Sequence, residues 1–500
     1  MELEFTSNML QYLKPVFCDE RCREESTDAI IPDSSPDVER IITVSAAAVM
    51  RSKESRNGSV SVSGGIRCSV LYLAEQEQQP RCLEVYLPYS IRADEPSFSE
   101  DSQVIFVPWL RGADARVVNS RKLNVRAELC YSLRVFEKQQ EQLPVLSSCP
   151  ETLQTLQAVY PVLLPMEMTE RSFRLTEELQ LPQSRPLKGQ VLYYEPRLEL
   201  TEKRLAGNKA VFKGLVHASV IYESAENKLC SLQAELPFSQ FCELREVYDE
   251  ETPEILLTVT GSEVERTARQ DGDGLLFTVH ILAQSIVSAR RELSVIRDAY
   301  SVDGELAALW KELELQSSLD RQNYTRTLRE SWQGPVDEIV GVSAYLDEPF
   351  AQRSENSAEL VVNVNMKVLY REPGGALQEC CVRTALHEQL AAAPEVLLHL
   401  SAAVAGEPAV LPTAGGMELR CTVHFSVETL SEGKYRTLCG GSIREREAYS
   451  GRPAVIVRRT RSGERLWDIA KENCTTVERI RKANKMDAEE TECGILLIPT

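Results

Sequence analysis

The sequence has no long hydrophobic run, and its beginning is not apolar. No apolar stretch approaches the roughly 18–20 residues that a membrane-spanning helix needs. The first residues, MELEFTSNMLQYLKPVF, carry acidic side chains early and contain no apolar core of the length that a secretory signal requires. We therefore expect a protein that stays in the cytoplasm where it is made, with no direct membrane insertion.

The sequence also lacks the common signatures of catalysis and cofactor binding. It has no GxxxxGK(S/T) phosphate loop, no HExxH metal motif and no GxSxG nucleophile elbow. The pair Gly415-Gly416 is predicted to form a hairpin turn instead. Histidine is scarce, and three of the five lie in strand-like runs, where an imidazole is more often packed or exposed than catalytic; the five are His217, His280, His387, His399 and His424. We expect no enzyme, no catalytic residue, no cofactor and no metal, although a lone Ser or Cys nucleophile stays open.

Cysteine is not scarce, but its pattern is scattered. Of the 14 cysteines, Cys18 and Cys22 are four residues apart, and Cys380 and Cys381 are adjacent, yet no CxxC pair recurs. Most lie in apolar runs, as Cys130 does, where free cysteine behaves as a small hydrophobic residue. We predict structural thiols in a reducing compartment, with metal or disulfide roles as the alternatives.

The charge balance excludes several kinds of partner. A net charge of −19 argues against general binding of nucleic acid or anionic membranes. From Arg452 onward, however, 10 basic and 8 acidic residues give +2, so the remainder carries −21. Solvated helix faces explain this in the simplest way, and a partner surface chosen by charge is the alternative. With 500 residues, 43% hydrophobic and 26% charged, the chain has room for several domains with real cores.

A pattern of about 150 residues recurs through the first 450. Residues 59–73, 209–223 and 358–372 can be aligned on Tyr72, Tyr222 and Tyr370, which are 150 and 148 residues apart. Each segment alternates apolar and polar side chains, which predicts a strand with one buried face. Further alternating stretches at 123–136, 276–289 and 418–430 complete each unit, so we predict about three tandem β-sandwich-like repeats, or open barrels, in a mainly β protein.

Glycine and one helical pattern add detail to these units. Gly64 and Gly214 interrupt the first two aligned segments at the same place, which suggests a bulge or a bend, whereas Val362 occupies that place in the third. A helix is predicted between the second and third units, because Leu306, Leu309, Trp310 and Leu313 have i, i+3, i+4, i+7 spacing after the N-cap candidate Asp303. The predicted layout begins with an N-terminal segment (1–25) and two repeats (26–150 and 151–302). A helical connector (303–332), a third repeat (333–450) and a C-terminal domain (452–500) follow.

The last fifty residues predict a small domain of strand, helix, helix and strand. Val455 and Val457 alternate as in a strand, and Ser462-Gly463 forms a turn. Leu466, Ile469 and Ala470 give the apolar face of one helix; Thr475 and Glu478 have the spacing of a capping box before a second, with Val477, Ile480 and Ala483. Residues 495–498 form the final strand.

This tail resembles a LysM domain, a module that usually binds glycans containing N-acetylglucosamine, such as peptidoglycan or chitin. The residues that carry the resemblance are Gly463, Leu466, Trp467, Ile469, Ala470, Val477, Ile480, Asn484, Gly494, Leu496, Ile498 and Pro499. The family's usual Gly-Asp-Thr or Gly-Asp-Ser turn is Gly463-Glu464-Arg465 here. A long cation therefore replaces a small hydroxyl on one wall of the sugar groove.

The whole layout resembles the SPOCS-domain, SipL-like spore coat proteins of spore-forming Firmicutes. GGIRCSVLY followed by LPYS, and GLVHASVIY followed by LPFS, carry this resemblance together with the terminal LysM-like tail. It implies a non-enzymatic scaffold of spore coat assembly in the mother-cell cytoplasm, at the forespore surface. Its partner would be the coat morphogenetic ATPase, a protein that the LysM domain would bind.

The alternative is a protein that binds N-acetylglucosamine glycan through the groove between its two turns. In either case the expected contact residues are those of the two turns: Ser462, Gly463, Glu464, Arg465, Leu466, Asn484, Lys485, Met486 and Asp487.

Overall fold

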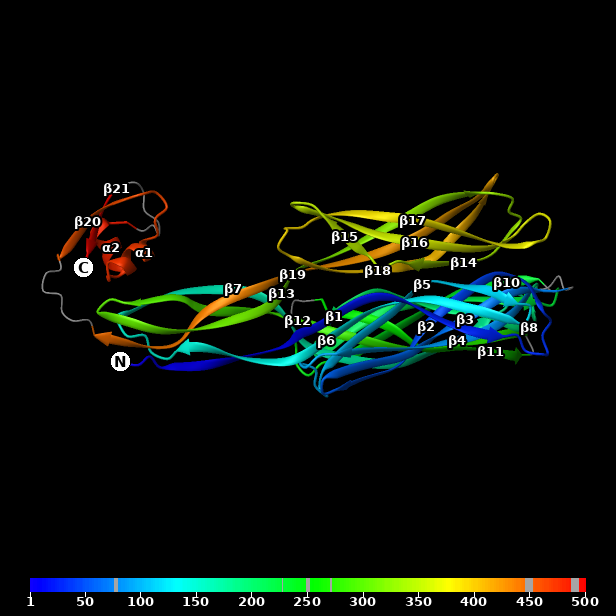
Figure 1. Cartoon of the computed structure of the whole chain (residues 1–500), viewed down its shortest axis with the longest axis horizontal. Coiled ribbons are helices and arrows are strands. Elements are labelled where there is room, and N and C mark those ends of the chain that lie inside the picture. The colour runs from blue at the N-terminus through cyan, green and yellow to red at the C-terminus, as the bar shows by residue number, and fades with distance from the viewer. Residues whose placement is uncertain (76–79, 227, 249–251, 270–271, 446–452, 487–493) are drawn as a thin grey trace.

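The computed structural model describes the chain except residues 76–79, 227, 249–251, 270–271, 446–452 and 487–493. The described residues form 21 strands and two short helices, which confirms a mainly β protein. The molecule is elongated (Figure 1), with the sheets gathered at one end and long strands extending from them as a narrow stalk. The small C-terminal module lies near the far end of the stalk, close to the N-terminus. Neither helix within the described ranges is long and apolar enough to cross a membrane.

Three consecutive parts of the chain each form antiparallel sheets with the same order of strands. The first part has the sheets β2-β3-β4 and β1-β6-β5, made of β1 (Phe5–Ile30), β2 (Val38–Arg56), β3 (Ser59–Ala74), β4 (Pro80–Asp94), β5 (Gln103–Asn119) and β6 (Lys122–Leu146). The second has β8-β9-β10 and β7-β12-β11, made of β7 (Leu153–Gln180), β8 (Leu187–Leu205), β9 (Lys209–Ser224), β10 (Leu229–Glu243), β11 (Glu254–Arg269) and β12 (Gly272–Ser301).

The third part and the C-terminal module complete the chain. The third part has the sheet β13-β19-β18 and a sheet centred on β16, made of β13 (Gly304–Gln333), β14 (Glu338–Leu346), β15 (Phe350–Arg353), β16 (Ser357–Arg371), β17 (Leu377–Ala391), β18 (Leu397–Thr413) and β19 (Gly416–Glu445). The module has β20 (Val455–Thr460), α1 (Leu466–Glu472), α2 (Val477–Asn484) and β21 (Gly494–Pro499). The predicted hairpin at Gly415-Gly416 is confirmed, because Thr413 and Gly416 pair across it.

Alternating side chains explain why the two sheets of each part face one another. Val60 and Val70 of β3 are fully buried and share one core with Leu123 and Leu129 of β6. The second and third parts have corresponding cores, between β9 and β12 and between β16 and β19. Each fully buried valine or leucine contributes about 1.5–3 kcal/mol by leaving water.

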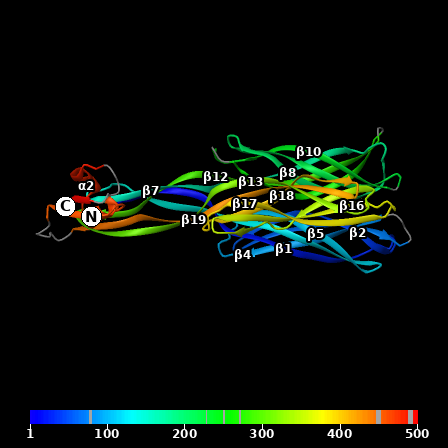
Figure 2. The same ribbon diagram turned by 90° about the horizontal axis from the view of Figure 1, so that it is seen from above.

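The stalk is built from the long strands of all three parts (Figures 1 and 2). The strand pairs β1–β6, β7–β12 and β13–β19 continue beyond the sandwiches and pack together there. Their shared core contains the buried side chains of Leu10, Tyr12, Val162, Leu164, Leu293, Val295, Leu313 and Leu315. The prediction of a helix over 303–332 is therefore wrong.

The spacing that indicated a helix has a different cause in β13. Leu306 and Trp310 face a cluster on one side of the strand, whereas Leu313 and Leu315 face the cluster on the other side. The buried positions change from even to odd numbers, close to a register shift between Leu309 and Trp310. When the buried side of a strand changes in this way, its apolar residues have the same i, i+4, i+7 spacing as those of a helix. Leu309, the remaining member of the pattern, is 64% exposed.

Two further expectations need correction. Residues 5–25 of the predicted N-terminal segment belong to β1, which pairs with β6 on both sides of residue 25. Cys130, expected to be a free apolar thiol, forms a disulfide with Cys22, directly opposite on β1. Six of the other described cysteines are buried free thiols, whereas Cys18, Cys149 and Cys381 are exposed. Burial raises the pKa of Cys68 to about 12, which keeps that thiol protonated and unreactive.

The bulges suggested by Gly64 and Gly214 lie in the neighbouring strands. The register shifts between Met50 and Ser52 opposite Gly64, and between Leu200 and Glu202 opposite Gly214. A Cβ on Gly214 would lie 2.2 Å from the carbonyl oxygen of Glu199 and 2.4 Å from the ring of Phe238. In the third part the neighbouring strand is interrupted between β14 and β15, so Val362 fits at the equivalent place.

Gly214→Ala should therefore lower the melting temperature, because the added methyl group must displace backbone. We expect a cost of about 1–3 kcal/mol in the free energy of unfolding, as for overpacked cores. Gly112→Ala is the matched control, since a Cβ there meets nothing within 4 Å. Equal melting temperatures for the two variants, measured by calorimetry, would contradict this reading of the glycine.

Candidate functional site

The C-terminal module, residues 453–500, has a small apolar core, to which Tyr300 and Val302 also contribute. Leu466, Ile469, Ala470, Ile480, Leu496 and Ile498 are buried together. The Oγ1 of Thr476 accepts a hydrogen bond from the backbone N–H of Arg479 at 3.1 Å and so caps α2. The cap predicted at Thr475 is wrong by one residue, because Thr475 is fully buried before the helix. Ala483, expected on the apolar face of α2, is exposed.

The first predicted turn is only partly available to a ligand. Ser462, Gly463 and Arg465 are exposed, and Gly463 has the positive φ of +85° that such a turn requires. Arg465 precedes α1 as its N-cap without a side-chain capping bond. Glu464 is half-buried, with its carboxylate 3.7 Å from the guanidinium of Arg458. Leu466 is fully buried in the core, so it is structural rather than a contact residue.

The second predicted turn is similarly divided. The Asn484 side chain pairs with the backbone of β21, donating to Leu497 O at 2.6 Å and accepting from Leu497 N–H at 2.8 Å. Lys485 is exposed in the left-handed conformation that ends α2, and Met486 packs against the core. Asp487 lies outside the described residues. The two turns therefore expose Ser462, Gly463, Arg465 and Lys485, while Leu466 and Asn484 hold the module together.

An apolar surface that the motif reading missed lies on the two-stranded sheet. One face of β20 and β21 covers the module's core, and the opposite face, here called the outer face, exposes four aliphatic side chains. Their exposed fractions are 48% for Val455, 64% for Val457, 74% for Ile495 and 39% for Leu497. Val457 is paired with Leu497, and Arg459 with Ile495, so a cation borders the patch. The strict alternation from Val455 to Arg459 is the sequence signal that predicts this face.

Side chains of β12 attach the module to the stalk. Asp298 accepts hydrogen bonds from Trp467 Nε1 at 2.7 Å and from Lys471 Nζ at 2.6 Å. The Tyr300 hydroxyl donates to the carbonyl of Thr475 at 2.8 Å, and its ring packs edge-on against Trp467 with centroids 4.9 Å apart. Burial alone would raise the pKa of Asp298, but the bonds from Lys471 and Trp467 outweigh it and hold the pKa below its ordinary value. This attachment leaves the outer face uncovered among the described contacts.

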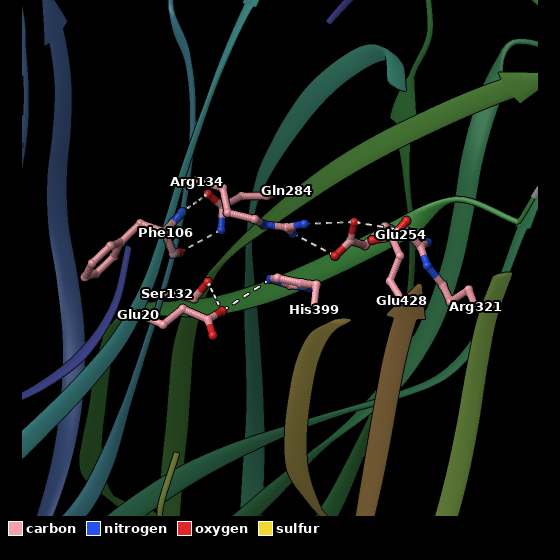
Figure 3. A network of polar contacts seen from close by, with 9 residues as sticks. All are labelled: Glu20, Phe106, Ser132, Arg134, Glu254, Gln284, Arg321, His399 and Glu428. Atoms are coloured by element: carbon pink, nitrogen blue, oxygen red, sulfur yellow. Dashed lines mark hydrogen bonds and ion pairs between the residues drawn. The ribbon is translucent and has the colours of Figure 1, made fainter. Parts of the chain in front are cut away.

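A second polar cluster lies where the three parts meet (Figure 3). Arg134 of β6 donates to Glu254 of β11 at 2.7 Å, and Arg321 of β13 lies 2.9 Å from Glu428 of β19. Burial alone would raise the pKa of Glu254, but Arg134 and Arg321 together lower it far below its ordinary value. Charges from all three parts thus neutralise one another, so removing one member would leave a buried charge unpaired.

The histidines are distributed as packed or exposed side chains. His217 is buried beside Glu199, with Nε2 and Oε2 at 2.6 Å, and His424 and His387 are exposed. No pattern in the sequence predicted a contact between His399 of β18 and residues of β1. In the structure, His399 Nε2 lies 3.2 Å from the carboxylate of Glu20.

We expect Asp298→Asn to loosen the module from the stalk. Its partners are partly exposed, so the charge contributes about 0.5–1 kcal/mol after solvent screening. Because folding lowers the pKa of Asp298, this contribution is complete above the ordinary aspartate pKa and is lost as pH falls through the lowered value. Hydrogen exchange in residues 298–302 and 466–475 measures it: the wild type should lose protection on acidification toward the variant's level. Glu314→Gln, in an exposed pair with Lys434, is the control, and equal effects of the two variants would contradict the assignment.

Comparison with known families gives one match. A family model described as "SipL, SPOCS domain" matches residues 189–265, which cover most of β8, all of β9 and β10, and most of β11. No curated protein and no solved structure matches the chain. The matched segment contains half of the second part's core, including the alternating strand β9 that carries the aligned Tyr222. Residues 189–265 are thus similar to the SPOCS domain of SipL, and this match supports a role related to the spore coat.

Proposed function

We propose that the protein is a non-enzymatic scaffold of endospore coat assembly, acting in the mother-cell cytoplasm at the forespore surface. The SPOCS match within the second part supports this role. The first and third parts, with the same strand order, would be further SPOCS repeats. In this proposal the C-terminal module is a LysM-type domain that binds the coat morphogenetic ATPase.

The outer face of the module is the observation that carries the binding proposal. A contiguous apolar patch on the surface of a protein often marks an interaction site. Protein interfaces typically have an apolar centre and a polar rim, and arginine is enriched in them. Val457, Leu497, Ile495 and the bordering Arg459 have this composition. The matching partner surface is apolar at its centre and acidic at its edge.

Glycan binding is the competing function, and the two turns favour it less. A sugar groove needs small polar groups and open backbone at the turns. Here the exposed side chain after Gly463-Glu464 is the long cation Arg465, and Asn484 is already bonded to β21. Protein docking would therefore use the exposed side chains of the outer face. Glycan binding would need the Asn484 side chain, which is already hydrogen-bonded to β21.

The test is the double variant Val457→Asp and Leu497→Asp in the full-length protein. Burying a valine and a leucine is worth about 1.5–3 kcal/mol each, and about 1.4 kcal/mol corresponds to tenfold in affinity. Affinity for the purified ATPase, measured by biolayer interferometry, should fall at least tenfold. Val159→Asp is the matched control, since this valine is 57% exposed on the stalk.

Titration of the wild type with N-acetylglucosamine oligomers separates the two functions. We expect no binding at millimolar oligomer. Unchanged affinity of the double variant for the ATPase, or oligomer binding that Arg465→Ala alters, would overturn the docking proposal.

A further inference from the structure

Three side chains with metal-ligating atoms meet where the first part contacts the third. Cys18 and Glu20 lie on β1, and His399 lies on β18. Their sulfur, oxygen and nitrogen ligand atoms all lie within 4.8 Å of one another. Figure 3 shows Glu20 and His399 turned toward each other, with Oε1 and Nε2 3.2 Å apart.

These separations suit a four-coordinate ion. Zinc binds thiolate, imidazole and carboxylate at 2.0–2.3 Å, so neighbouring ligands of a tetrahedral site lie about 3.3–3.8 Å apart. The Glu20–His399 distance is already of this size, and the cysteine sulfur needs to move by roughly 1 Å. A fourth position stays open to water.

The His399 Nε2 atom is buried and faces the Glu20 carboxylate at 3.2 Å. The imidazole nitrogen and the carboxylate oxygen therefore already converge, as two ligands of one ion must. Glu20 is oriented by Ser132, whose Oγ donates to Oε1 at 2.9 Å, as the outer partners of metal ligands typically do.

The charge balance also favours a divalent cation. Arg134 lies directly opposite Cys18 across β1 and β6, and its charge is matched by Glu254 at 2.7 Å. Arg321 is matched by Glu428 in the same way. Once metal binding releases the Cys18 thiol proton, the thiolate and the Glu20 carboxylate carry two negative charges, which one divalent ion neutralises.

We infer that Cys18, Glu20 and His399 form a zinc site that joins the first and third parts. On binding, the thiol proton of Cys18 is released to solvent, the Sγ–Zn, Oε–Zn and Nε2–Zn bonds form, and no electron is transferred. The site is structural: it fixes β18 against β1. This inference is independent of the proposed coat function.

The direct test is titration of the full-length protein with Zn²⁺ by calorimetry, in oxygen-free buffer without thiol reductant so that the Cys22–Cys130 bridge stays closed. We expect one tight equivalent, with a dissociation constant of micromolar or below. Co²⁺ at the same site should give a thiolate charge-transfer band in the near ultraviolet and tetrahedral d–d bands in the visible.

Three variants identify the ligands. Cys18→Ser should abolish the charge-transfer band, and His399→Asn and the nearly isosteric Glu20→Gln should each weaken zinc at least tenfold. Cys381→Ser, which replaces an exposed free cysteine outside the cluster, should change nothing. Absence of stoichiometric binding at 100 µM Zn²⁺, about a hundredfold above a micromolar dissociation constant, would overturn the inference. Equal binding by wild type and Glu20→Gln would also overturn it.

Discussion

The apolar core shared by three pairs of long strands is the constraint on which the rest of the structure depends. A single pair of antiparallel strands is marginally stable in water, because it has no partner for its apolar face. In the stalk, Leu10, Leu164, Leu293 and Leu313 come from four different strands and bury one another. This packing commits all three parts of the chain to one body, and the neutralised charges around Glu254 maintain that arrangement where the sandwiches begin.

The position of the C-terminal module follows from the stalk. Asp298 and Tyr300 lie near the end of β12, and they hold α1 and the residue before the cap of α2. These contacts attach the module to the stalk, and the outer face of its two-stranded sheet stays exposed to solvent. In the function proposed above, this apolar, arginine-bordered face at the end of a long body would bind a protein partner at a distance from the sandwiches.

The local periodicity of the sequence predicted many of the buried strands, but it did not predict the contacts between strands that are distant in the sequence. Alternation around Tyr72, Tyr222 and Tyr370 was enough for the buried strands, because one face of each meets a single core. Alternation did not predict β13, because its buried side changes along the strand and its apolar residues are spaced as in a helix. The contacts Asp298–Trp467 and Glu20–His399 could not be predicted from the sequence, because the packing of distant elements leaves no local pattern. The outer face could have been predicted, because Val455 and Val457 alternate with the residues that face the core.

The most direct test of this account is hydrogen exchange on a Leu164→Ala variant, because Leu164 is fully buried in the stalk core. Truncating such a leucine costs about 2–5 kcal/mol. If the stalk core unites the three parts, protection should fall together in the stalk halves of β1, β7, β12 and β13, and at the attachment of the module to Tyr300. Loss of protection confined to β7 and its direct partner β12 would contradict the account.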